Sequence, residues 1–146
     1  MAWIWVAAAV VFVLVLLVVF FAGKSLQLKR TKEVLDKFRG KKVYGVTSDA
    51  NYFGRESEGR MQMRGNGVLV FTPEELYFEM WLPQEELRIP LSSITGVETP
   101  MRHLGKSKGR RLLKVHFRNE KGEKDSAAWI VNRLEKWKKA LTDISS

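Results

Sequence analysis

Basic side chains gather in one glycine-spaced segment in the last third of the chain. Residues 102–118 contain no acid, and the basic residues nearest to Gly105 and Gly109 are Arg102, Lys106, Lys108, Arg110 and Arg111. A flexible loop of this composition can surround a phosphate with backbone N–H groups and charged donors. We therefore predict that these residues bind an anion, with the headgroup of an anionic lipid as the expected ligand. Two other interpretations stay open: a solvated loop whose charge keeps the protein soluble, and a site for nucleic acid or an acidic protein.

Chemistry beyond charge recognition has little support in the sequence. The chain has no cysteine, which excludes a thiolate nucleophile, a disulfide and a zinc finger of the usual ligand type. The run Leu104-Gly105-Lys106-Ser107 ends like a phosphate-binding P-loop, but Pro100 stands where that motif requires glycine. His103 and His116 have no helical partner ligand and are expected to be surface residues. We therefore expect no enzyme activity, no catalytic residue, no metal and no cofactor.

The first 22 residues contain no charged, hydroxyl or amide side chain. As an α-helix they cover about 33 Å, slightly more than the roughly 30 Å hydrocarbon core of a bilayer. Fourteen of them are Ile, Val, Leu or Phe. Each of these contributes about −0.3 to −0.6 kcal/mol on the membrane-insertion scale, so their sum is roughly −4 to −8 kcal/mol. The sequence therefore predicts a transmembrane anchor over residues 1–23.

A cleavable signal peptide is the competing interpretation of this segment. Such a peptide has an apolar stretch of about 7–15 residues and small residues around its cut. Here the stretch is longer, and cleavage after Ala22 would place Phe20 where a small residue is required. A buried helix of a soluble domain is disfavoured too, because so short a chain has no interior that could cover a helix apolar on all sides.

A basic segment follows the predicted anchor. Residues 24–42 carry eight Lys or Arg against Glu33 and Asp36. Because Lys and Arg near a span stay on the cytoplasmic side, we predict a single-pass protein of the cell membrane with its N-terminus outside and its C-terminal domain in the cytoplasm. The segment is expected to continue the helix as far as Gly40, either as a solvated stalk or as a basic stretch lying on anionic lipid. In the second case the lipid contacts would come from Lys24, Lys29, Arg30 and Lys32.

Beyond residue 42 the apolar pattern changes from helical to alternating, which predicts a separate domain over residues 43–146. Strands are expected at 43–46, 68–71, 76–82, 87–91, 94–97, 112–118 and 125–131. Pro90 indicates an edge strand, because proline donates no hydrogen bond to a neighbouring strand. Residues 49–64 are expected to be a loop or an irregular hairpin and receive no definite element. An amphipathic helix with Leu134, Trp137, Leu141 and Ile144 on one face ends the chain. The predicted fold is mainly β with α: an antiparallel sheet or barrel of about seven strands, covered by the C-terminal helix.

Trp81 stands out within the strand predicted at 76–82. Its position in the alternation puts it on the face opposite to Leu76, Phe78 and Met80, close to a turn. An indole exposed at such a place is suited to contact with a partner. We therefore predict a partner contact at Trp81.

Three runs of the predicted domain resemble a known pattern: GNGVLVFT at 65–72, ELYF at 75–78 and LRIPLSSI at 87–94. Together with the closing helix around Trp137, they are similar to bacterial pleckstrin-homology-like (PH-like) and GRAM-like domains over about residues 64–142. The resemblance implies a bent sheet of about seven strands capped at one end by the last helix, and a role in lipid or protein binding. The basic motif usual in the family lies nearer the start of the domain, so the resemblance does not extend to the basic loop.

These observations together predict a membrane-anchored PH-like interaction module at the cytoplasmic membrane surface. Its expected partner is anionic lipid or another membrane protein. The alternative is a membrane-tethered scaffold without lipid binding. A nucleic-acid-binding module is less favoured, because the sequence has no long interleaving of aromatic and basic residues.

Overall fold

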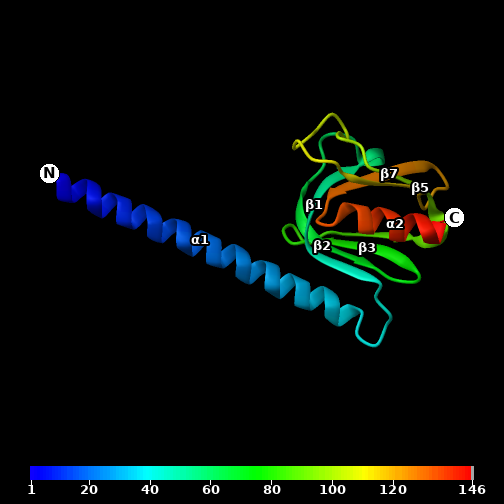
Figure 1. Ribbon diagram of the computed structural model, residues 1–146, viewed down its shortest axis with the longest axis horizontal. Helices are drawn as coiled ribbons and strands as arrows, with labels where there is room; N and C mark the ends of the chain where they lie inside the picture. The colour runs from blue at the N-terminus through cyan, green and yellow to red at the C-terminus, as the bar shows by residue number, and fades with distance from the viewer. Residues whose placement is uncertain (146) are drawn as a thin grey trace.

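The computed structural model describes residues 1–145 of the chain. Its elements are α1 (Ala2–Lys37), β1 (Gly45–Arg55), the 3₁₀ helix η1 (Glu56–Glu58), β2 (Gly65–Phe71), β3 (Glu75–Met80), β4 (Glu86–Pro90), the 3₁₀ helix η2 (Leu91–Ser93), β5 (Ile94–Glu98), β6 (Leu113–Arg118), β7 (Lys124–Ile130) and α2 (Leu134–Ser145). The predicted fold class is confirmed, because a long apolar N-terminal helix precedes an antiparallel sheet and one C-terminal helix (Figure 1).

All strands belong to one seven-stranded antiparallel sheet of order β4-β3-β2-β1-β7-β6-β5. The strand that contains Pro90 lies at an edge of this sheet, as predicted. The central strand β1 is irregular, because its register shifts between Thr47 and Ala50 against β2 and between Tyr52 and Gly54 against β7. Such bulges bend a strand and increase its twist. The bend in β1 is visible in Figure 1, and it turns the two halves of the sheet toward each other.

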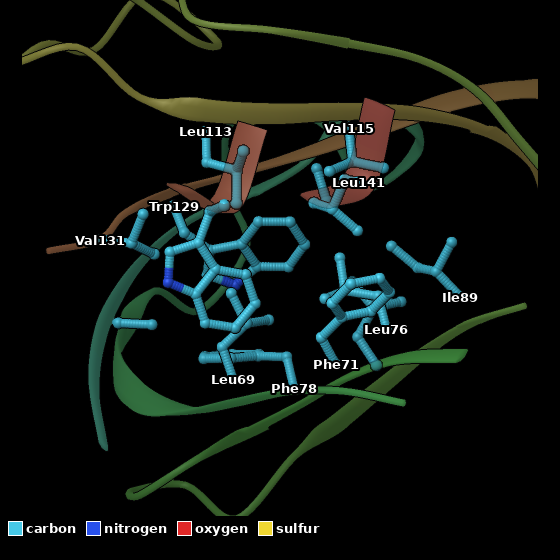
Figure 2. Close-up of a cluster of buried hydrophobic side chains, with 14 of the residues drawn as sticks. Leu69, Phe71, Leu76, Phe78, Ile89, Leu113, Val115, Trp129, Val131 and Leu141 are labelled. Atoms are coloured by element: carbon cyan, nitrogen blue, oxygen red, sulfur yellow. The ribbon is translucent and has the colours of Figure 1, made fainter. Parts of the chain in front are cut away.

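The core fills the space between these two halves. Trp129 is fully buried, with its ring centroid 5.8 Å from those of both Tyr52 and Phe78. Figure 2 shows side chains of β2, β3, β6 and β7 around this indole, with Leu141 of α2 beside them. Trp137 and Leu141 are buried as the predicted helix face requires, whereas Ile144 is 44% exposed. The helix α2 therefore completes the core of the bent sheet.

The start of the sheet differs from the sequence prediction. The expected strand at 43–46 is the beginning of β1, which starts at Gly45 and continues to Arg55, into the segment that had received no element. Asp, Asn and Gly are poor strand formers, so the composition of this segment does not indicate a strand. Its two register shifts also interrupt the alternation by which a strand is recognised.

The helix α1 runs without a break from the predicted anchor into the basic segment. Residues 1–25 are all exposed, and this part of the helix is long and apolar enough to cross a membrane. Further along, Val34 and Phe38 are buried against Val68, Val70 and Tyr77 on the outer face of the sheet. The end of α1 is therefore not a free stalk, because it packs on the domain that follows it.

Candidate functional site

A pocket of about 540 Å³ opens between β1 and the loop that joins β5 to β6. Its lining consists of Asn51, Tyr52, Phe53, Arg64, Gly65, Arg102, Gly105, Lys106, Ser107 and Lys108. Four of these side chains are cationic and none is acidic. We call this the cationic pocket. With no carboxylate in its lining, its charge is available to an anion from outside the chain.

A tight turn at 103–106 gives the basic loop its shape. His103 and Lys106 exchange two backbone hydrogen bonds of 3.1 and 3.0 Å, and the central residues Leu104 and Gly105 have φ of 51° and 76°. Two left-handed residues in succession are the requirement of a type I′ turn, and glycine meets it without strain. The turn places Lys106 at the wall of the cationic pocket.

His103 fastens this turn to β1. Its ring is buried, and Nε2 lies 3.0 Å from the carbonyl oxygen of Gly54, to which it donates in the neutral Nε2–H form. The expectation of a surface histidine is therefore wrong. Because burial disfavours the charged ring, it lowers the pKa of His103 below its ordinary value of 6.5.

The lowered pKa predicts that acid loosens the basic loop. Neutral His103 is favoured in the folded state, so its contribution to stability is complete above pH 6.5 and decreases as the pH falls below that value. We expect hydrogen-exchange protection of residues 103–112 to decrease between pH 7.5 and 5.5, and this dependence to disappear in His103→Gln. The variant His116→Gln is the control, since His116 lies on β6 and pairs with Glu98. An equal pH dependence in His103→Gln would contradict the role of the ring.

Arg64 is the member of the cationic pocket that the sequence analysis did not identify. Its Nε donates to the carbonyl oxygen of Phe53 at 2.7 Å, while Nη2 is buried and has no hydrogen-bond partner among the described residues. A buried donor without an acceptor costs free energy. Arg64 fell in the segment without an assigned element. Arg64 reaches the pocket because its neighbour Gly65 pairs with Tyr52, and this pairing leaves no local signal in the sequence.

The predicted anion ligands separate into two groups. Arg102, Lys106 and Lys108 line the cationic pocket, and Lys108 Nζ donates to Asn51 Oδ1 at 3.1 Å. Arg110 and Arg111 are exposed outside it, and Arg111 donates to the carbonyl oxygen of Thr99 at 3.0 Å. The structure thus brings three of the five residues together and adds Arg64 to them.

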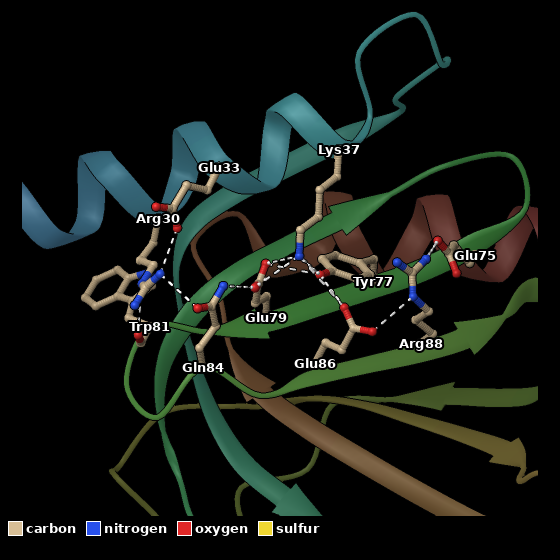
Figure 3. Close-up of polar contacts among 10 residues, drawn as sticks. All are labelled: Arg30, Glu33, Lys37, Glu75, Tyr77, Glu79, Trp81, Gln84, Glu86 and Arg88. Atoms are coloured by element: carbon tan, nitrogen blue, oxygen red, sulfur yellow. Dashed lines mark hydrogen bonds and ion pairs between the residues drawn. The ribbon is translucent and has the colours of Figure 1, made fainter.

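The second polar site joins α1 to the sheet (Figure 3). Glu79 is buried on the outer face of β3, where its carboxylate accepts hydrogen bonds from Lys37 Nζ at 3.1 Å and from Gln84 Nε2 at 2.7 Å. Burial alone would raise the pKa of Glu79, but the hydrogen bonds from Gln84 and Lys37 hold it below its ordinary value. We call this contact the helix dock. It comprises Arg30, Val34 and Lys37 of α1 and Phe38 directly after it, together with Tyr77, Glu79, Trp81 and Gln84.

Two predicted contacts are corrected by the helix dock. Arg30 was expected on lipid, but it donates to the Trp81 carbonyl oxygen at 3.1 Å and to Gln84 Oε1 at 3.0 Å. Trp81 was expected to be exposed, but it is half-buried and packs beside the cluster of Val34 and Phe38. The alternation placed Trp81 on the correct face of the strand; α1 covers that face. Lys24, Lys29 and Lys32 are exposed.

A buried acid also holds the loop between β1 and β2. Asp125 of β7 accepts hydrogen bonds from Arg55 Nε at 2.5 Å, from Ser57 N at 3.0 Å and from Ser57 Oγ at 2.7 Å. This network ties η1, and with it the beginning of the loop that carries Arg64, to the sheet. Within residues 1–145, no three His, Asp or Glu side chains are grouped so that they could hold a metal ion.

Comparison with known proteins finds likeness in structure only. No family model matches the chain, and no curated protein matches it. A crystal structure of the C-terminal domain of an unknown protein from Leishmania infantum is similar, with a TM-score of 0.56 and 11% sequence identity. The match covers 79% of this chain and 94% of that one. At this identity the likeness shows a shared fold and carries no function.

Proposed function

We propose that the protein is a single-pass membrane protein that displays a PH-like module on the cytoplasmic surface, where the cationic pocket docks on anionic headgroups of the same membrane. The observation that carries the proposal is the pocket itself: its lining has four cationic side chains and no acid. Its attachment to a helix long enough to cross a bilayer indicates where the anions are.

The helix dock supports this proposal by setting the height of the domain. Arg30, the basic residue of α1 that binds the end of β3, stands seven residues beyond Gly23, or about 10 Å along the helix. The headgroup layer of one leaflet is about 5–8 Å thick. In Figure 1 the yellow loop between β5 and β6 projects on the side of the domain that faces the N-terminal half of α1. The cationic pocket therefore lies on the membrane side of the domain.

The sheet supports the PH-like part of the proposal. The resemblance implies a bent antiparallel sheet closed by a terminal helix, and the strand order with α2 across the core agrees with it. The cationic pocket is formed by β1 and the loop from β5 to β6, whereas the basic motif usual in the family lies nearer the start of the domain.

A single fluorescent label tests the docking in the full-length chain. Because the chain has no cysteine, Ser107→Cys gives one labelling site in the cationic pocket. In nanodiscs we expect the dye to move into an apolar environment when phosphatidylglycerol is added to phosphatidylcholine, and to return to water at high salt. Loss of Arg102, Lys106 and Lys108 removes up to about 1 kcal/mol each of attraction to anionic lipid.

A charge-matched variant provides the control. Arg102→Gln, Lys106→Gln and Lys108→Gln together should abolish the response of the dye to phosphatidylglycerol. Lys121→Gln, Lys124→Gln and Lys139→Gln remove the same charge at exposed positions outside the pocket and should leave the response unchanged. A dye that responds equally to neutral and anionic nanodiscs, or equally in both variants, would refute the proposed docking.

A further inference from the structure

Three large apolar side chains are exposed in the connections from β1 to β2 and from β3 to β4. Met61 is 98% exposed, Met63 58% and Leu82 73%. Among the described residues that follow α1, no other large apolar side chain is as exposed. Met61 and Met63 lie in the loop from β1 to β2, and Leu82 lies in the turn from β3 to β4. We call these three residues the apolar edge.

The apolar edge comes close to the cationic pocket at Leu82. The antiparallel pairings of Tyr52 with Gly65 and of Gly67 with Met80 bring the two connections to the same end of the sheet. The carbonyl oxygen of Leu82 lies 3.9 Å from where a Cβ on Gly65 would stand. Gly65 and its neighbour Arg64 line the cationic pocket. Leu82 therefore lies close to the cationic pocket, whereas Met63 lines a neighbouring hollow together with Glu85 and Glu86.

The helix dock turns the apolar edge toward the span. Arg30 donates to the carbonyl oxygen of Trp81, the residue directly before Leu82, and to Gln84 two residues after it. Lys37 binds Glu79 farther back along β3. Figure 3 shows Arg30, Trp81 and Gln84 at the end of the dock that is nearer to the N-terminus of α1. Arg30 thus holds the turn from β3 to β4 on both sides of Leu82. This turn lies at the end of the helix dock that is nearer to the apolar part of α1.

We propose that the apolar edge inserts into the interfacial layer of the same membrane, so that the domain holds the bilayer by shallow apolar contact as well as by charge. The inference rests on the proposed membrane anchoring. The occupant is lipid, because the span of the chain itself brings a bilayer to this end of the domain. Glu85, which is exposed in the same turn, stays in water and limits insertion to the side chains of the edge.

Depth measurements on the full-length chain test the inference. Single cysteines at Leu82 and Met61 are labelled with a fluorophore in nanodiscs of pure phosphatidylcholine, and quenchers are attached either to shallow lipid positions or to a water-soluble carrier. We expect lipid-borne quenching at both positions to exceed by several-fold that of a label at Lys121, an exposed residue of the hairpin between β6 and β7. A label at Leu82 that is as accessible to water as the label at Lys121 would overturn the inference.

A second comparison separates the apolar edge from the cationic pocket. With the label at position 61, Met63→Ser together with Leu82→Ser should weaken lipid-borne quenching in neutral and anionic nanodiscs alike, by about tenfold for each side chain that inserts fully. High salt should not alter this loss. The double variant Val46→Ser, Ile144→Ser, at exposed apolar positions outside the edge, should have no effect. The label at Leu82 could insert while the triple variant of Arg102, Lys106 and Lys108 leaves the response of the dye to phosphatidylglycerol unchanged. That result would support lipid insertion and refute headgroup docking.

Discussion

Replacing Asp125 with alanine is expected to lower the free energy of unfolding by about 3–5 kcal/mol, because it leaves a largely buried cation without its counter-charge. The side chain of Asp125 is fully buried and that of Arg55 is 14% exposed. The substitution also removes the acceptor of the Ser57 and Ser126 backbone N–H groups. Urea unfolding in nanodiscs, followed by tryptophan fluorescence, measures the loss. Glu123→Ala, an exposed acid of the preceding turn, is the control and should change stability by less than about 0.5 kcal/mol.

The same carboxylate makes stability depend on acid. Burial alone would raise the pKa of Asp125, but hydrogen bonds from Arg55 and Ser57 lower it below the ordinary value of 3.8. Its contribution is therefore present above pH 3.8 and is lost as the pH falls through the lower folded pKa. Asp125→Asn should be less stable at neutral pH and should lose less stability on acidification than the native chain. Equal acid dependence in the two proteins would refute this assignment.

Placing a carboxylate in the helix dock should release α1 from the sheet. Val34 is 1% exposed and packs with Phe38, Val68, Val70 and Tyr77. In Val34→Asp an unpaired charge enters this cluster, at a cost of several kcal/mol that undocking avoids. Gln27 Nε2 and Ser48 Oγ are 3.1 Å apart in the docked helix. We expect cysteines at positions 27 and 48 to be joined by a short bifunctional thiol reagent in the native background and not in Val34→Asp.

The neighbouring residue offers the matched control for this variant. Leu35 is 40% exposed, so Leu35→Asp adds the same charge outside the buried cluster and should leave the crosslink intact. Undocking should also withdraw the labels at positions 82 and 107 from lipid, since both depend on the position of the domain relative to α1. A crosslink that persists in Val34→Asp, or is lost in both variants, would argue against the dock.

Much of the sheet was predictable because its signals are local. In β3, Leu76, Phe78 and Met80 alternate with the other face, and β6 does the same with Leu113, Val115 and Phe117. Only the start of β1 was predicted, because beyond Val46 its bulges interrupt the alternation and its composition is that of a loop.

The candidate site was predictable only where neighbours in sequence are neighbours in space. Lys106 and Lys108 belong to one loop, so their clustering could be seen in the sequence. Arg64 joins them through strand pairing, and Arg30 binds the end of β3 through the docking of a helix. Alternation identified the face of the strand on which Trp81 lies. It contains no information on which element covers that face, and so the indole was taken as exposed.

In a protein anchored as we propose, the unbroken course of α1 would link the orientation of the domain to the thickness of the bilayer. No bend separates the apolar part of the helix from the part held by Glu79, so the sheet leans whenever the helix leans. A rigid span longer than the local hydrocarbon layer tilts to fit it, and it tilts more in a thinner membrane. A change in that tilt changes the distance between the turn at Lys106 and the membrane surface. A thin and a thick membrane would thereby present the same basic loop at different heights above their lipids.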